Sequence, residues 1–159
     1  MKALSEKDLQ NYLDEHHIEA KILMMREPTP TVAEAARALK IEEDQVLKSL
    51  VFKTPSGPVL VIANGCRRID YKLLANHLGV GRRKVKFCPS ELVAETTGFV
   101  VGSMPPFGHI VPMRTLVDTR VTDLDLVYAG GGAVDAMLEL TTTTLLKHSQ
   151  AEILDLSCP

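Results

Sequence analysis

The spacing of apolar and polar residues predicts two helices and a strand in the first part of the chain. Ser5 has an aspartate three residues on and can cap a helix whose apolar face ends near His16. Thr31 has a glutamate three residues on and can cap a second amphipathic helix, which ends near Lys40. Between them, the apolar run 22–25 stops at a proline-rich turn and predicts a strand.

Two apolar runs, 46–53 and 59–63, give the clearest strand signal in the chain. The residues between them include two prolines and a glycine, which favour a turn of hairpin length. We therefore expect an antiparallel hairpin over residues 46–63, formed by two neighbouring strands of one sheet.

The rest of the chain alternates between predicted helices and short apolar runs. Asp70 can cap a helix that ends at Gly79. Pro89 suits the first position of another helix, which stops before Gly98. Later runs predict strands at 99–101, 109–111, 115–117, 124–129 and 136–140, then a helix at 142–148 and an apolar segment at 152–154. With no repeat or linker, we expect one α+β domain over residues 1–159, with a mixed, curved, barrel-like β-sheet surrounded by helices.

Composition narrows the classes of function. Of 159 residues, 45% are apolar and 24% are charged, which fits a folded protein. The net charge is −2, aromatic residues make up 4% and tryptophan is absent, which excludes a broad basic nucleic-acid surface and a base-stacking reader of single strands. The three cysteines are widely spaced and fit neither a zinc knuckle nor a disulfide scaffold. No apolar run is long enough to cross a membrane, so we expect a cytoplasmic protein.

Lys48 stands out on the first strand of the predicted hairpin. Strand alternation places it on the same face as Val46, Leu50 and Phe52, so its ammonium group points where apolar side chains point. Burying an unpaired ammonium group is costly. The side chain therefore reaches solvent, pairs with a carboxylate or meets an anionic ligand, and these three readings remain open.

Two glycine-rich segments carry further candidate chemistry. Residues 102–109 read Gly-Ser-Met-Pro-Pro-Phe-Gly-His, and such a rigid loop can hold a carbonyl oxygen or an oxyanion with its backbone amides. An ordinary tight connection between strands fits the same residues. Gly130–Gly132 lack the lysine and hydroxyl residue of a phosphate-binding loop. They fit a close backbone crossing, the second wall of a pocket or a bulged turn.

Positive charge is concentrated in residues 67–86. These hold seven Lys and Arg residues and one Asp, a local charge of +6 in a chain whose total is −2. Such a strip can contact several phosphates, or it can be a solvated face. The histidines lack the spacing of a metal site and no G-x-S-x-G nucleophile elbow occurs, so we expect no metal and no cofactor.

Taken together, five segments resemble the YbaK/prolyl-tRNA editing family in their order and approximate spacing. They are Thr-Val-Ala-Glu-Ala-Ala at 31–36, Lys-Ser-Leu-Val-Phe at 48–52, Val-Leu-Val-Ile at 59–62, Thr-Gly-Phe at 97–99 and the loop 102–108. The resemblance covers about residues 15–140. It implies a mixed α/β domain around a curved, barrel-like sheet, and hydrolysis of the ester that joins a wrong amino acid to the 3′ end of tRNA.

The resemblance also implies roles for individual residues. Lys48 looks like the family's essential lysine, which would hold the phosphate or ribose of the terminal adenosine. Gly102 and Pro106 match the family's G-x-x-x-P loop, whose backbone would hold the aminoacyl group and its carbonyl, while the substrate's own 2′-hydroxyl or a positioned water assists. The expected catalytic residues are Lys48, Gly102 and Ser103. The expected substrate-binding residues are Thr31, Ser49, Met104, Pro106, Phe107, Gly108, His109, Gly130 and Gly131, and Arg82, Arg83 and Lys84 would contact the tRNA backbone.

Three loop residues depart from many relatives and bear on the substrate. Ser103 stands in place of a second glycine, and Met104 and Pro105 lie inside the loop. Esters of alanine, cysteine, serine and threonine all remain open. We expect a trans-acting deacylase for tRNA-Pro or a related tRNA carrying a small amino acid, with aminoacyl-tRNA and an aminoacyl-tRNA synthetase as partners. The alternatives are a non-catalytic binder of aminoacyl-tRNA 3′ ends and a hydrolase of a small aminoacyl or nucleotide ester.

Overall fold

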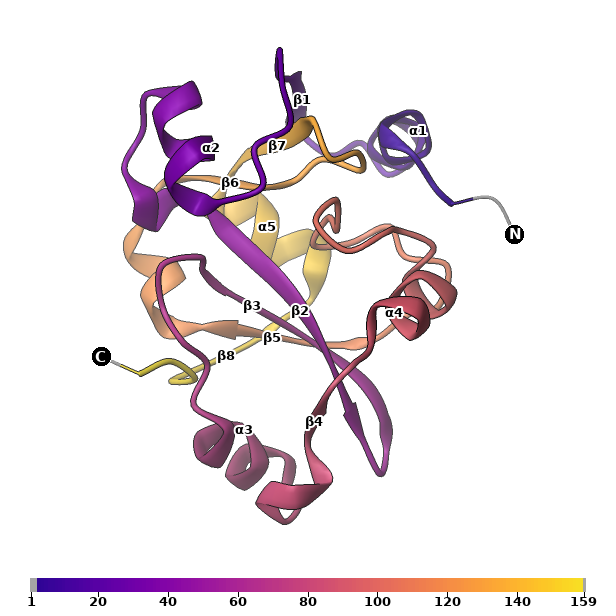
Figure 1. Ribbon diagram of the computed structural model, residues 1–159, viewed down its shortest axis with the longest axis vertical. Coiled ribbons are helices and arrows are strands. Elements are labelled where there is room, and N and C mark those ends of the chain that lie inside the picture. Colours follow the sequence, from indigo (N-terminus) through magenta and orange to yellow (C-terminus); the bar gives the residue numbers. More distant parts are fainter. Residues whose placement is uncertain (1–2, 159) are drawn as a thin grey trace.

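Over the part of the chain that it describes, residues 3–158, the computed structural model contains two β-sheets with helices around them (Figure 1). The strands are β1 (Ala20–Met24), β2 (Leu47–Thr54), β3 (Gly57–Asn64), β4 (Lys86–Phe87), β5 (Arg114–Asp118), β6 (Leu126–Gly130), β7 (Ala136–Thr141) and β8 (Glu152–Leu154). The α-helices are α1 (Glu6–Glu15), α2 (Val32–Leu39), α3 (Tyr71–Leu78), α4 (Ser90–Thr97) and α5 (Thr142–Ser149). Short 3-10 turns occupy Glu43–Gln45, Arg82–Lys84 and Thr119–Asp123.

The caps expected from the sequence begin three of the helices. Ser5 caps α1, and the Asp8 carboxylate accepts the Ser5 N–H at 2.7 Å, completing a capping box. The Thr31 hydroxyl caps α2, and the Asp70 carboxylate accepts two N–H groups at the start of α3. Gly79 follows α3 in the left-handed conformation that suits glycine. The predicted starts of these helices are confirmed.

The two sheets meet but do not close into one. The larger sheet has the order β4-β2-β3-β5-β8, antiparallel from β4 to β3 and parallel from β3 to β8, and the smaller is an antiparallel β1-β7-β6 sheet. An isolated bridge between Val46 and Tyr128 joins them where β2 begins. The predicted mixed α+β class is confirmed, but the barrel-like sheet is wrong: over residues 3–158 neither sheet closes, because the ladders of β6 and β2 meet only at that bridge.

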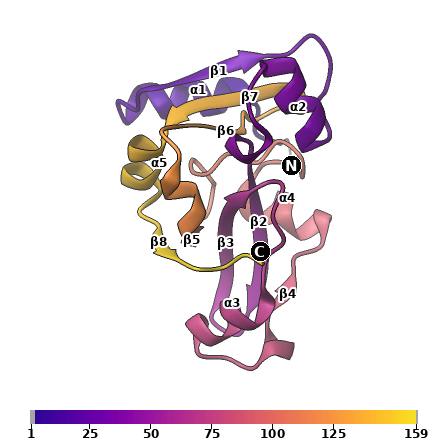
Figure 2. The same cartoon turned by 90° about the vertical axis from the view of Figure 1, so that its left-hand side faces the viewer.

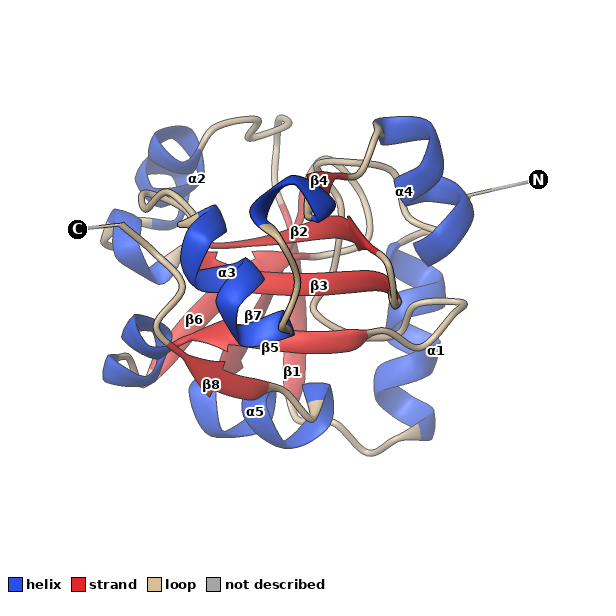
Figure 3. Ribbon diagram, turned by 90° about the horizontal axis from the view of Figure 1, so that it is seen from below, coloured by secondary structure: helices blue, strands red, loops and turns tan. Residues whose placement is uncertain are grey.

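The layers leave three buried clusters. Figure 2 shows the smaller sheet lying across one end of the larger sheet, and apolar residues from the facing sides of both fill the space between them, with α1, α4 and α5 packed at its borders. Figure 3 shows α3 over the outer face of the larger sheet, where Leu74 and Ala75 pack on Phe52 and Leu116. A smaller cluster lies under α2, around Ala35 and Tyr128. None of the helices described is long and apolar enough to cross a membrane.

Two predicted strands are wrong. Residues 99–101 and 109–111 form parts of one long loop between α4 and β5. Phe99 is fully buried against the core, whereas Val101 and Ile110 are about half exposed, so these apolar runs reflect a core anchor followed by loop rather than a sheet ladder. α4 begins at Ser90, one residue later than predicted. The two-residue strand β4 was not predicted, because it is too short to show a period.

Candidate functional site

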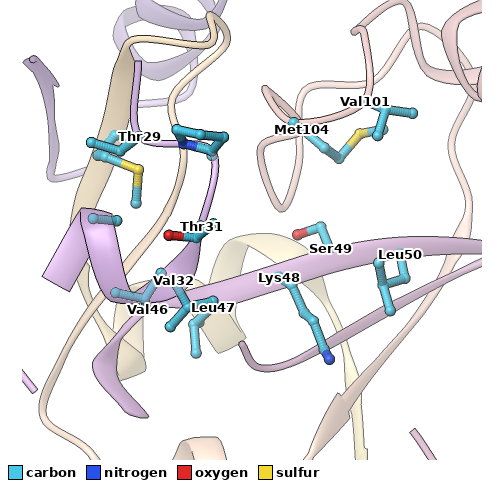
Figure 4. Close-up of a pocket in the computed structure, with 15 residues that line it drawn as sticks. Thr29, Thr31, Val32, Val46, Leu47, Lys48, Ser49, Leu50, Val101 and Met104 are labelled. Atoms are coloured by element: carbon cyan, nitrogen blue, oxygen red, sulfur yellow. The ribbon is translucent and has the colours of Figure 1, made fainter. Parts of the chain in front are cut away.

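A cavity of about 260 Å³ opens where the start of β2 meets the N-terminus of α2, the long loop before β5 and the β6–β7 turn (Figure 4). We call it the front cavity. Its lining residues are Thr29, Pro30, Thr31, Val32, Ala35, Val46, Leu47, Lys48, Ser49, Leu50, Val101, Gly102, Met104, Gly130 and Met137. The fold therefore brings together six of the site residues predicted from sequence: Thr31, Lys48, Ser49, Gly102, Met104 and Gly130.

Lys48 and Ser49 point to opposite sides of β2. The Ser49 hydroxyl points toward the side of the cavity where Met104 lies, whereas the Lys48 side chain runs the other way (Figure 4). Ser49 Oγ is buried and has no hydrogen-bond partner within residues 3–158, so it is free to bond a ligand. The alternation that placed Lys48 on the face of Leu50 is confirmed, since both lie on the side of the α3 cluster.

The Lys48 ammonium group has a backbone partner. Its Nζ donates to the Arg67 carbonyl oxygen in the loop that follows β3. Burial lowers the pKa of the Lys48 ammonium, and the electrostatic interaction with the nearby Cys66 partly opposes this. None of the three sequence readings named a carbonyl acceptor, because the partner lies in another loop.

Thr31 forms part of the opposite wall of the cavity. Its hydroxyl accepts the N–H of Glu34 at 3.1 Å, and this cap fixes the side chain at the N-terminus of α2. Figure 4 shows the Thr31 and Ser49 hydroxyls on the same side of β2. The cavity thus presents two hydroxyl groups among mostly apolar walls.

The loop over the cavity is held by its own backbone at Ser103. Ser103 is fully buried, its hydroxyl donates to the Val100 carbonyl at 2.8 Å, and its carbonyl accepts the Gly132 N–H at 2.9 Å. Gly102 is exposed with φ of +91°, a conformation that favours glycine. Gly102 therefore faces the cavity with bare backbone, and the Ser103 hydroxyl is turned into the loop.

The segment Gly130–Gly132 contacts the loop 102–109 at Gly130. A Cβ atom at Gly130 would lie 2.1 Å from the Met104 carbonyl oxygen, so the two backbones touch where no other residue would fit. A Cβ at Gly131 would lie 2.6 Å from the Ala136 backbone. Of the three interpretations of Gly130–Gly132, the close backbone crossing is confirmed at Gly130 and Gly131, and Gly130 also lines the front cavity.

Four predicted substrate-binding residues lie on the other side of the loop. Pro106, Phe107, Gly108 and His109 line a separate cavity of about 460 Å³ between α1 and α5, which we call the rear cavity. Phe107 is 4% exposed and stacks on Tyr12 with 5.9 Å between ring centroids. His109 Nε2 donates to the Pro105 carbonyl at 2.8 Å, and burial lowers the pKa of this imidazole, against the opposing effect of that hydrogen bond. The fold does not bring these four residues to Lys48.

The positive residues divide into two groups. Arg82, Arg83 and Lys84 form an exposed 3-10 turn, which we call the basic turn. It directly precedes β4, which pairs with the end of β2 away from Lys48, and the Arg82 guanidinium lies 4.2 Å from the Tyr71 ring centroid. Arg67 differs, because its Nε donates to Ser157 Oγ at 2.8 Å.

Sequence reasoning missed several apolar walls of the front cavity. Val101 and Met137 line it from segments far apart in the chain. Val101 could have been predicted from its position beside Gly102, but nothing in the sequence indicates that Met137 lines the cavity. Within residues 3–158, no three His, Cys, Asp or Glu side chains gather closely enough to hold a metal ion.

The chain is similar to proteins of known family. Residues 26–148 match the model of the aminoacyl-tRNA editing domain, a range that contains every residue lining the front cavity. The uncharacterised protein YwhH of Bacillus subtilis is 25% identical over 151 residues, which cover 94% of each chain. A proline--tRNA ligase of Streptococcus gordonii is 27% identical over 128 residues, which are 79% of this chain but 20% of the ligase.

The fold has a close counterpart among solved structures. The crystal structure of a candidate trans-editing enzyme for prolyl tRNA synthetase superposes with a TM-score of 0.89, at 30% identity, over 97% of both chains. The agreement therefore extends over nearly the whole chain.

Proposed function

Because the chain belongs to the aminoacyl-tRNA editing domain family, we propose that it is a trans-acting deacylase that hydrolyses the ester bond of mischarged tRNA. The proposal is supported above all by one observation: the family match contains the whole front cavity, where bare loop backbone and two hydroxyls face the same space and Lys48 leaves the same strand on its other side. The proposed setting is the cytoplasm, with tRNA-Pro or a related tRNA carrying a small amino acid as the substrate.

The size of the front cavity supports a small aminoacyl group. Pockets that enclose drug-sized ligands measure about 300–1,000 Å³. At about 260 Å³ the front cavity suits a short side chain and its ester, and the rest of the tRNA would stay outside. Met104 and Val101 are two of the apolar residues that line that space, and they would contact the amino-acid side chain.

The proposed chemistry uses polarisation rather than a protein nucleophile. Backbone at Gly102 and Met104 would polarise the ester carbonyl, and the Ser49 hydroxyl would donate a hydrogen bond to the aminoacyl group. A water oxygen, assisted by the substrate's 2′-hydroxyl, forms the new bond to the carbonyl carbon. The bond from that carbon to the ribose oxygen breaks, the ribose oxygen takes a proton, and the free amino acid leaves.

Lys48 has a different role in this proposal. Its ammonium points away from Ser49, so it would meet the phosphate or ribose of the terminal adenosine rather than the ester carbonyl. A phosphate is a suitable partner, because a compact ammonium group binds it as a point charge.

The remaining predicted site residues would act through the loop. Ser103 and residues 106–109 hold its backbone from behind, by a hydrogen bond and by packing on α1, and Gly131 packs on Ala136 next to the Gly130 that touches Met104. We propose that they fix the position of Gly102 and do not contact the substrate.

Deacylation of a panel of charged tRNAs tests the proposal. Wild-type protein is mixed with tRNA carrying Ala, Cys, Ser or Thr, and release of the amino acid is followed. We expect release from at least one, and a loss of about 100-fold or more in Lys48→Ala, the scale of removing a key electrostatic group. Lys21→Ala is the matched control, since Lys21 is an exposed strand lysine of β1 outside the front cavity. Silence across the panel would rule out the deacylase, and binding without release would support the non-catalytic binder.

A second variant tests whether tRNA itself is the substrate. We expect Arg83→Ala with Lys84→Ala to weaken deacylation of charged tRNA and to reduce its dependence on salt. Arg82 is left in place because it packs on Tyr71. Unchanged activity in this variant, with equal activity on a small aminoacyl ester, would favour the small-ester hydrolase.

A further inference from the structure

A chain of hydrogen bonds links the Lys48 ammonium to a buried carboxylate. Lys48 Nζ donates to the Arg67 carbonyl, and the Arg67 side chain donates from Nε to Ser157 Oγ at 2.8 Å. Ser157 Oγ donates in turn to Asp118 Oδ2 at 2.8 Å. Asp118 is fully buried and Ser157 is 2% exposed, so the far end of this chain is shielded from water.

The Asp118 carboxylate is fixed on both of its oxygens. Oδ1 accepts the Leu156 N–H at 2.8 Å and an Arg120 N–H at 3.3 Å, and Oδ2 accepts the Ser157 hydroxyl. A buried charge is tolerated only when it is paired and hydrogen-bonded in this way. The carboxylate is therefore a rigid anchor at the end of β5.

Backbone hydrogen bonds also join the C-terminal segment to the loop after β3. The Asp70 N–H donates to the Leu156 carbonyl and the Cys158 N–H donates to the Arg68 carbonyl, each at 2.7 Å. Ile69 and Ser157 form an antiparallel bridge. The Arg67 carbonyl lies next to these contacts, so the segment that carries Asp118's partners also fixes the acceptor of Lys48.

The same loop is held from its other side at Gly65. The Gly65 N–H donates to the Val46 carbonyl at 2.7 Å, and a Cβ at Gly65 would lie 2.5 Å from a Val32 methyl carbon. Residues 65–68 are therefore fixed between the wall of the front cavity and the C-terminal segment.

We propose that Asp118 and Ser157 are positioning residues for Lys48: they hold Arg67, and the Arg67 carbonyl then fixes the direction of the ammonium group. The role of Lys48 in deacylation rests on the proposed function, whereas the way in which its ammonium group is oriented does not. A lysine side chain is long and flexible, and a reacting or binding group displaced by about 1 Å can cost about 100-fold in rate. In this role Asp118 and Ser157 fix Arg67 and do not contact the substrate.

A double-mutant cycle on deacylation gives the first test. We expect Ser157→Ala to slow single-turnover deacylation about 10-fold, and to have no further effect in the Lys48→Ala background, because Ser157 acts only through the ammonium group that Lys48→Ala removes. A merely structural Ser157 would slow both backgrounds equally, and that result would overturn the proposal.

Two further variants separate positioning from stability. Arg67→Met keeps the backbone carbonyl but removes the bond to Ser157 together with one positive charge, so at high salt, where contacts to phosphates are screened, it should reproduce the Ser157→Ala effect even if that variant folds poorly. Arg114→Gln is the matched control. Arg114 pairs with Glu152 at 2.7 Å and ties β5 to β8, but it does not touch Arg67, so its loss should leave deacylation unchanged.

Nuclear magnetic resonance of the lysine ammonium groups tests the coupling without substrate. The Lys48 signal is assigned by its absence in Lys48→Ala, and its proton exchange with water is measured in wild type and Arg67→Met. We expect exchange at least several-fold faster in the variant. If no tRNA of the panel is deacylated but this exchange changes, the proposed function fails and the positioning proposal stands. Unchanged exchange overturns the positioning proposal whatever the activity.

Discussion

Residues 101–104 and residues 105–109 belong to one loop, yet only the first part faces the front cavity. Val101 and Gly102 are exposed there, while Phe107 is packed against α1 and lines the rear cavity. A backbone that is to polarise a carbonyl needs one accessible face and no freedom to move. Different residues of the same loop meet these two requirements.

The largest loss of stability is expected from a change in the buried part of the loop, residues 105–109. We expect Phe107→Ala to lower the free energy of unfolding by about 3–5 kcal/mol, since it leaves a cavity in the core. Val101→Ala, at a side chain 53% exposed, should change it by no more than about 0.5 kcal/mol. Urea denaturation measures both. Equal losses would mean that the two parts of the loop are not distinct.

A smaller loss of stability is expected at Gly102, in the exposed part of the loop, and it tests the role of that residue. Gly102 and Gly57 both have positive φ, +91° and +113°, and open space around them. Alanine at either should cost about 1–3 kcal/mol of stability through backbone strain. Only Gly102→Ala should also slow deacylation, by about 10-fold, because only this strain displaces the loop at the cavity. Equal rates in the two variants would argue against a role for Gly102.

The smallest expected effect concerns pH. Burial holds the folded-state pKa of His109 below its unfolded value of about 6.5. As pH falls below about 7 the unfolded chain therefore binds this proton first, and stability is lost down to the folded-state pKa. His109→Gln can still donate to the Pro105 carbonyl and should lose less stability than wild type between pH 7 and pH 5. Parallel curves from denaturation at each pH would show that His109 does not contribute.

Local signals predicted much of the fold. The caps Ser5, Thr31 and Asp70 act within one helical turn, and the turn at residues 54–58 joins adjacent strands, so neighbouring residues suffice to predict them. The strands at 99–101 and 109–111 were wrong because an apolar run does not show whether its backbone finds a partner strand. The parallel pairing of β5 with β3 and β8 had no signal of its own.

The sequence predicted the site residues that belong to recognisable motifs, but not the residues that hold those motifs in place. Lys48 follows from strand alternation and Gly102 from the glycine-proline loop, whereas Ser49 was predicted only through the family resemblance, and the front cavity brings the three together. The bond from Arg67 to Ser157 joins residues 90 positions apart, and no periodicity marks such a pair. The loop motif also gave no means of telling that Phe107 faces the rear cavity, since the side of a loop is set by what packs against it.

The pairing of β1 with β7 has a consequence for how the protein is made. Met24 pairs with Ala136 and Ala20 with Leu140, so the smaller sheet forms only after most of the chain has been synthesised. Contacts between such distant positions slow folding, because the entropy of closing a long loop is lost before these contacts form. A nascent chain that ends before Ala136 lacks Met137 and the Ala136 backbone on which Gly131 packs, so it holds an incomplete cavity. Any activity of the front cavity therefore appears late in translation.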